Sequence, residues 1–131
     1  MKLYYFDLYG IGEPIRMLLT YCKVQFEDIR LDGDKMVKLK SEGLFEFGQT
    51  PMLELDDGTR LVQTSAILSY LGSQHGMTPD DAMMRYWGEC TVQHKLDMIR
   101  PLFACISEAD EHLQKKKTED FATGGLVMYL A

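Results

Sequence analysis

The sequence contains no asparagine, so it offers no acceptor for N-glycosylation. It has three cysteines, which are widely spaced, and no Cys-x-x-Cys pair. A disulfide framework and dithiol redox chemistry therefore both lack the residues that they need. Packed, reduced thiols are typical of a cytoplasmic protein, and we expect that location.

Long apolar runs are also missing. No stretch approaches the length of a membrane-spanning helix, and Asp7 interrupts the apolar residues at the N-terminus. The sequence therefore predicts neither a membrane span nor a signal peptide.

Positive charge is not in excess, because the formal net charge is −6 at pH 7. Nucleic acid and anionic membrane surfaces are therefore not expected as the main partners. His75, His94 and His112 are scattered without the spacing of metal ligands, so we expect no metal. What the chain does have is a globular composition, with 46% hydrophobic and 26% charged residues in 131 residues. That length is enough for one ordinary domain or two small ones.

The stretch 47–71 has the pattern of a hairpin followed by a helix. Residues 52–55 are apolar and favour a short strand, and residues 60–62 favour a second one. The Asp-Gly pair at 57–58 predicts a tight turn between them, because glycine adopts a positive φ without steric cost. Thr64 can then cap a helix that runs to the end of the stretch.

Two details of this stretch suggest a binding site. A cis bond between Thr50 and Pro51 would leave the backbone N–H and C=O of Thr50 pointing outward, where they can pair with an extended, peptide-like ligand. The helix start at Gln63 and Thr64 offers free N–H groups and the positive end of the helix dipole, which favour a carboxylate. The alternatives are a trans bond before Pro51, which is the majority form, and a Thr64 that only caps its helix.

The order of elements predicts an α/β fold of the thioredoxin-like type. A strand at 2–6, a helix from Glu13 and a strand at 25–30 form a βαβ unit, which implies a right-handed crossover and a parallel pair. A short helix at 34–42 comes before the hairpin. The whole order is βαβαββα, a mixed four-stranded sheet with helices on both faces. We expect this domain to span residues 1–76.

The remainder, residues 77–131, is predicted to be a partial all-α domain. A long helix begins at residues 78–79, which combine a cap residue with a proline, and extends to about Arg100. Pro101 should kink or end this helix. A second helix or a bent continuation follows between 102 and 117, and an irregular tail completes the chain.

Three short sequences, in this order and spacing, resemble the glutathione-binding domain of the cytosolic glutathione transferases. They are Gln-Thr-Pro at 49–51, Asp-Gly at 57–58 and Leu-Val-Gln-Thr-Ser-Ala-Ile-Leu at 61–68. The likeness is greatest to the alpha and sigma classes and covers residues 2 to about 76. It implies an enzyme that adds the thiolate of glutathione, its co-substrate, to electrophilic small molecules.

The resemblance places a catalytic tyrosine at Tyr5, in the sequence Leu-Tyr-Tyr-Phe. A free thiol has a pKa of about 8.5, and a hydroxyl aimed at the sulfur stabilises the thiolate and lowers that pKa. Tyr4 should face the other side of the sheet. The alternative interpretation is that Tyr5 is a strand aromatic without a chemical role.

The resemblance also implies the contacts with glutathione. The backbone of Thr50, before Pro51, pairs with the cysteinyl unit. Gln63 and Thr64 hold the γ-glutamyl carboxylate. Lys40 and Gln49 face the glycyl end, where Lys40 supplies a positive charge, although a solvated helix lysine is the simpler alternative.

Two further residues imply a partner subunit. Asp97, on the long helix, aligns with a family acid that reaches across a dimer to the γ-glutamyl amine. Phe47 matches the aromatic residue that some classes insert into the partner. The alternatives are that Asp97 is an exposed helix acid and that Phe47 anchors its loop on its own core. We expect a homodimer or packing against another subunit.

Three departures from the family leave a second function open. Ile11 stands where alpha and sigma members carry a basic residue that supports the tyrosine. Met36 stands where an aromatic or basic residue often contacts the glycyl unit. The family's second domain, which helps build the pocket for the electrophile, is well over twice as long as the region here. The alternative is a catalytically weak or inactive relative that acts as a structural or binding subunit in a larger assembly.

Overall fold

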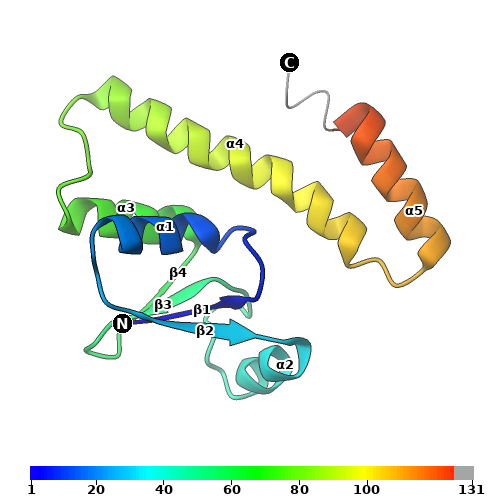
Figure 1. The fold of residues 1–131 in the computed structure, drawn as a ribbon, viewed down its shortest axis with the longest axis horizontal. Coiled ribbons are helices and arrows are strands. Elements are labelled where there is room, and N and C mark those ends of the chain that lie inside the picture. The colour runs from blue at the N-terminus through cyan, green and yellow to red at the C-terminus, as the bar shows by residue number, and fades with distance from the viewer. Residues whose placement is uncertain (126–131) are drawn as a thin grey trace. The chain divides into compact units, whose positions relative to one another are not determined.

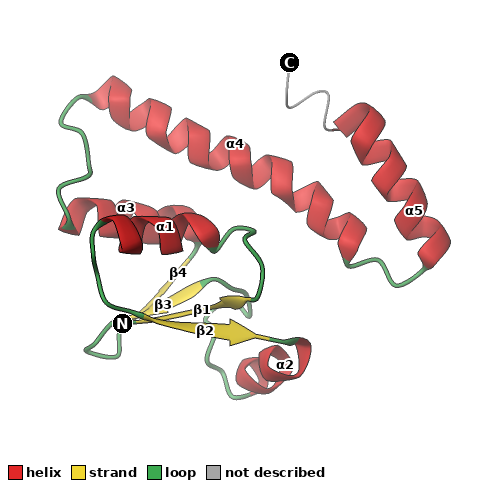
Figure 2. Ribbon diagram, viewed as in Figure 1, coloured by secondary structure: helices red, strands yellow, loops and turns green. Residues whose placement is uncertain are grey.

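The computed structural model describes residues 1–125 of the chain. They belong to two compact units, which meet in the sequence between Ala82 and Met83. Figure 1 shows the course of the chain, and Figure 2 shows its helices, strands and loops.

The first unit is a mixed four-stranded sheet with helices on both faces. Its elements are β1 (Lys2–Phe6), α1 (Glu13–Tyr21), β2 (Glu27–Leu31), α2 (Gly33–Ser41), β3 (Met52–Glu54), β4 (Arg60–Val62) and α3 (Thr64–Gln74). The strand order is β2-β1-β3-β4, in which β1 and β2 are parallel and the other neighbours are antiparallel. Helices α1 and α3 cover one face, and α2 lies on the other (Figure 1). The predicted thioredoxin-like fold is confirmed.

Alternation of side chains along the strands fills a separate apolar core on each face. The core beneath α1 and α3 contains the fully buried Leu3. The core beneath α2 contains Met52 and Phe45. Successive strand residues point to opposite faces, so Tyr5 shares the face of Leu3, while Tyr4 packs edge-on against Phe45.

A buried arginine holds the loop that joins β1 to α1. The side chain of Arg16 is 7% exposed. Its guanidinium donates to the Asp28 carboxylate on β2, at 3.0 and 3.2 Å, and to the Glu13 carboxylate, at 3.1 Å. It also donates to the main-chain carbonyls of Phe6, at 3.2 Å, and Leu8, at 2.9 Å. One side chain thus fixes the loop to both the sheet and α1.

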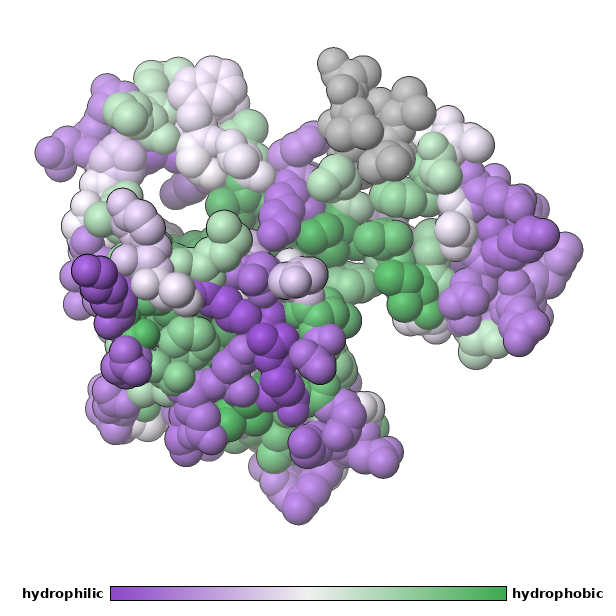
Figure 3. All heavy atoms as spheres, viewed as in Figure 1, coloured by the Kyte–Doolittle hydropathy of each residue, from purple (hydrophilic) through white to green (hydrophobic). Residues whose placement is uncertain are grey.

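The second unit is helical. It contains α4 (Ala82–Ile106), α5 (Glu111–Asp120) and a π-helical turn, η1 (Phe121–Gly125). Hydrophilic residues cover α5 (Figure 3), as its charged sequence requires. Residues 126–131 of the predicted tail lie outside the described residues.

The prediction for the long helix is wrong at both ends. The helix begins at Ala82 rather than at residues 78–79, and it continues through Pro101 to Ile106. A proline inside a helix costs about 3 kcal/mol, because it lacks the N–H donor and crowds the preceding turn. Leu96 and Cys105, on either side of the proline, are buried.

The two residues just before the predicted start of α4 end α3. Gly76 adopts a positive φ of 67°, and the N–H of Met77 donates to the Gly72 carbonyl at 2.8 Å. This is the hydrogen bond of a glycine-type helix end. The Thr78 hydroxyl lies against Gly72, about 3.5 Å from where a Cβ would stand. The helix-start signal at residues 78–79 therefore does not begin α4, because this segment follows directly on the end of α3.

The three cysteines are free. Cys105 is buried and Cys22 is partly buried, but Cys90 is exposed, so the expectation of packed thiols is wrong for Cys90. Among residues 1–125, no helix has both the length and the apolar character to cross a membrane.

We expect Arg16→Ala to lower the free energy of unfolding of the first unit by about 3 kcal/mol, because it removes a buried guanidinium and leaves the carbonyls of Phe6 and Leu8 without this donor. Arg30→Ala is the matched control. Arg30 pairs with Asp7 at 3.1 Å and Asp28 at 2.7 Å but is 41% exposed, so its removal should cost less than about 1 kcal/mol. Hydrogen exchange of the β1 amides measures both, since the single tryptophan, Trp87, lies in the other unit. Equal effects of the two substitutions would contradict the role given to Arg16.

Candidate functional site

The register of the sheet brings three strand ends side by side. Tyr4 pairs with Met52, and Met52 pairs with Val62. One residue further along each strand, Tyr5, Pro51 and Gln63 are therefore neighbours, with strands spaced about 4.8 Å apart. Directly opposed residues share a face, so all three lie on the side of the sheet that α1 and α3 cover. We call Tyr5, Pro51 and Gln63 the site edge.

The loop before β3 brings further predicted residues to this edge. The Thr50–Pro51 peptide bond is cis, and Pro51 is buried. Gly48 has a positive φ of 62°, and the Lys40 side chain from α2 lies across it, with Nζ 3.3 Å from the position that a Cβ would take. Gln49, between Gly48 and Thr50 in the loop, is exposed. Lys40, Gln49 and Thr50 thus belong to one corner of the first unit.

The phenol of Tyr5 is enclosed and accepts a hydrogen bond. The residue is 2% exposed, and its oxygen accepts the N–H of Ile11 at 3.1 Å. The Arg16 guanidinium stands 5.6 Å from the centre of the ring. Burial raises the pKa of the phenol above its ordinary value, and the Ile11 N–H and the Arg16 charge partly oppose that rise. Tyr5 therefore keeps its proton at neutral pH and can donate a hydrogen bond.

The ring of Tyr5 packs on a glycine. A Cβ built on Gly12 would stand 2.4 Å from Cδ1 of Tyr5, closer than any real contact. Only glycine allows the loop to pass this close to the ring. The main-chain carbonyl of Gly12 accepts hydrogen bonds from the N–H groups of Ile15 and Arg16, in the first turn of α1.

The start of α3 has no side-chain cap. Gln63 occupies the N-cap position with a φ of 71°, which is unusual for a residue other than glycine and is a mark of functional sites. Helices α2 and α5 differ, because Asp32 and Asp110 cap them. The first N–H groups of α3 therefore have neither intrahelical partners nor a cap, and they can hold an anion.

Thr64 is buried at 4% exposure, and its hydroxyl bonds to a residue outside its own helix. Its Oγ1 donates to the main-chain carbonyl of Ile11 at 3.1 Å. The carbonyl of Ile11 thus accepts a hydrogen bond from Thr64, and its N–H donates one to Tyr5.

Three further residues singled out in the sequence have other surroundings. Asp97 lies on α4 in the second unit and contacts Arg100 at 3.4 Å. Phe47 is 58% exposed, while Phe45 fills the core that its loop covers. Met36 packs against that same core from α2.

The sequence does not predict the parts played by Arg16, Gly12 and the Ile11 backbone. Ile11 was expected to deprive the tyrosine of a supporting cation. Its main-chain N–H supports the phenol instead, and Arg16, one turn into α1, carries the nearby charge. The sequence does contain one signal for this charge. Arg16 is a charged residue between the apolar positions Ile15 and Leu19, and such a residue indicates a buried ion pair.

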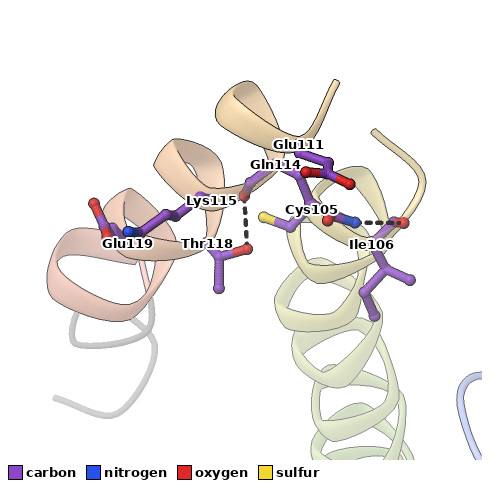
Figure 4. A pocket seen from close by; sticks show the side chains of 7 residues that line it. All are labelled: Cys105, Ile106, Glu111, Gln114, Lys115, Thr118 and Glu119. Carbon is purple, nitrogen blue, oxygen red and sulfur yellow. Dashed lines mark hydrogen bonds between the residues drawn. The ribbon is translucent and has the colours of Figure 1, made fainter. Parts of the chain in front are cut away.

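A pocket of about 370 Å³ lies in the second unit, between the end of α4 and α5 (Figure 4). The Cys105 thiol forms part of its wall. Its polar lining groups bond to one another: the Gln114 amide donates to the Ile106 carbonyl at 3.2 Å, and the Thr118 hydroxyl donates to the Gln114 carbonyl at 2.8 Å. No predicted site residue lines this pocket.

The fold and the site edge define a thioredoxin-like domain with a cis-proline corner beside a strand-end tyrosine. Residues 1–73 match the family model of the glutathione S-transferase N-terminal domain. The chain is 44% identical over 84 residues to glutathione S-transferase A3 of Mus musculus, covering 63% of this chain and 38% of that protein. It is 34% identical over 124 residues to glutathione S-transferase 1 of Ascaris suum, covering 92% and 59%. The solved prostaglandin synthase D of Nilaparvata lugens superposes with a TM-score of 0.84 at 32% identity, covering 98% of this chain and 63% of that one.

The family match includes the whole sheet and the site edge. The chain belongs to the glutathione S-transferase family, as the sequence resemblance predicts. It spans between 38% and 59% of the length of the two curated relatives named above.

We expect Gly12→Ala to displace the Tyr5 ring and to destabilise the first unit by about 1–3 kcal/mol, the usual cost of overpacking. Gly33→Ala, at the start of α2, is the control, because a Cβ there meets nothing within 4 Å. Chemical shifts of the Tyr5 ring and urea unfolding report the two effects. If the Tyr5 ring shifts stay at wild-type values in Gly12→Ala, the close packing is not a constraint.

Proposed function

We propose that the chain binds glutathione at the site edge and adds its thiolate to electrophilic small molecules. Family membership supports glutathione as the co-substrate. The single observation that carries the proposal is the phenol of Tyr5. It is buried, protonated and already accepting a hydrogen bond, so its own proton is left to donate to a sulfur.

The thiol chemistry follows from this donor. A hydrogen bond from the phenol to the sulfur stabilises the thiolate more than the thiol, so it lowers the pKa of the bound thiol. The reactive anion is then present at neutral pH, where a free thiol is mostly protonated. The Ile11 N–H polarises the phenol in the same direction, because it withdraws electron density from the phenol oxygen.

The remaining contacts follow the geometry of the first unit. We assign the cysteinyl unit to the main chain of Thr50, which would pair with it as in strand addition. The start of α3, at Gln63, offers N–H groups and a helix dipole to the γ-glutamyl carboxylate. Lys40 and Gln49 stand at the corner that the glycyl carboxylate would reach.

We expect Tyr5→Phe to lower the rate of conjugation by about 10²-fold, which is the usual loss when a charge-stabilising donor is removed. Tyr4→Phe is the matched control. It makes the same change on the same strand, on the opposite face, and should leave the rate near that of the wild type. Rates with glutathione and a chromogenic electrophile, with binding followed by calorimetry, measure both.

Three results would contradict the proposal in different ways. Equal rates in Tyr5→Phe and the wild type would remove the phenol from the chemistry. Binding of glutathione by the wild type without any turnover would favour the binding-subunit alternative. Absence of binding would remove Thr50 and Gln63 from the site.

We further propose that the protein is a cytoplasmic homodimer. Three free cysteines support a reducing compartment. Phe47, 58% exposed on its loop while Phe45 anchors the loop in the core, is available to insert into a partner. In such a dimer, Asp97 is the group proposed to reach the γ-glutamyl amine of the partner's glutathione.

We expect Phe47→Ser to shift the protein from dimer to monomer, because it removes a large apolar side chain from the proposed interface. Tyr21→Ser is the control, since Tyr21 is an exposed aromatic, 73% accessible, on α1. Sedimentation velocity at several concentrations distinguishes the two variants. A wild type that sediments as a monomer throughout would remove the dimer proposal and leave glutathione binding untouched.

A further inference from the structure

Two hydrogen bonds on either side of one Cα connect the helix start to the tyrosine. The Thr64 hydroxyl donates to the carbonyl of Ile11 at 3.1 Å, and the N–H of Ile11 donates to the phenol oxygen of Tyr5 at 3.1 Å. Thr64 and Tyr5 are themselves buried, at 4% and 2% exposure. The two bonds fix both peptide groups that flank Ile11.

Other contacts hold the loop around Ile11 as well. Gly12 follows it and lies in direct contact with the Tyr5 ring. On the opposite side, Arg16 holds the carbonyls of Phe6 and Leu8 at the start of the loop. The hydroxyl of Thr64 is thus the one side-chain donor, among the described hydrogen bonds, that acts on the Ile11 carbonyl.

A threonine hydroxyl has a single proton to donate. In this structure the hydroxyl donates to the Ile11 carbonyl. A carboxylate only accepts hydrogen bonds, so main-chain N–H groups at this place are further donors to it. The start of α3 supplies them, because its N-cap residue, Gln63, makes no side-chain cap.

We propose that the Thr64 hydroxyl is a positioning group for the Tyr5 phenol, acting through the main chain of Ile11. This inference rests on the proposed function and adds to it. The helix start and the tyrosine then form one connected unit. Loss of the hydroxyl frees the Ile11 carbonyl, lets the loop move and weakens the N–H bond to the phenol. Without that bond the pKa of the phenol rises, and its hydrogen bond to a thiolate becomes weaker.

The test compares Thr64→Val, which keeps the shape of the side chain but has no hydroxyl, with Thr64→Ser, which keeps the hydroxyl. The first measurement uses the full chain without glutathione. Exchange of the Ile11 amide hydrogen, followed by NMR with isoleucine labelled in nitrogen-15, should be roughly tenfold faster in Thr64→Val and near wild type in Thr64→Ser. This measurement does not depend on any activity. Should Thr64→Val fail to fold, Thr64→Ala removes the same donor with less crowding and carries the same expectation.

The second measurement uses glutathione. The pH midpoint of the thiolate absorbance should rise in Thr64→Val, and kcat should fall roughly tenfold while KM for glutathione stays within about twofold. Thr64→Ser should restore both values. A purely structural defect would not give this combination, in which the thiolate midpoint rises in Thr64→Val and returns in Thr64→Ser.

Opposite outcomes overturn the inference. Unchanged exchange of the Ile11 amide in Thr64→Val breaks the link between Thr64 and Tyr5. A large rise in KM with an unchanged thiolate midpoint assigns the hydroxyl to the carboxylate instead. If Ile11 exchange responds as expected but the wild type binds no glutathione, the proposed function fails while the contact from Thr64 to Ile11 stands.

Discussion

The site depends on how one loop is held between the first strand and the first helix. The buried Arg16 guanidinium ties this loop to Asp28 and to two main-chain carbonyls, and Thr64 and Tyr5 hold it at Ile11. Tyr5 lies 6 positions from Ile11, and Thr64 lies 53 positions from it, so both near and distant segments hold the loop. The loop is therefore fixed by tertiary structure, and the phenol has one defined position.

Enclosure of Tyr5 has two opposing effects on its chemistry. Burial favours the neutral phenol, and the hydrogen bond from Ile11 together with the charge of Arg16 favours the phenolate. Burial is the larger effect, so the group stays protonated while its oxygen is polarised. A donor with these properties suits the stabilisation of a neighbouring anion. A solvated tyrosine would keep its proton but would also be satisfied by water.

Local pattern predicts the sheet and the hairpin, because strand alternation and the Asp-Gly turn are encoded by neighbours in the chain. The role expected of Tyr5 comes from the family resemblance and not from local pattern. Local pattern does not predict Arg16, whose partners on β2 and in the loop are brought near only by folding. The start of α4 fails for a related reason: the Thr-Pro signal is genuine, but Gly76 and Met77 are already engaged in closing α3. The direction of the Thr64 hydroxyl likewise depends on a residue 53 positions away.

The residues of the site edge, together with their supports at Gly12, Arg16 and Thr64, all come from the first 64 positions of the chain. Domains generally fold in order from the N-terminus as synthesis proceeds. The unit that carries the site edge can therefore assemble on the ribosome while α4 and α5 are still being translated. A ligand that binds this unit would then be able to act on the nascent chain, favouring its folded form before the helical unit exists.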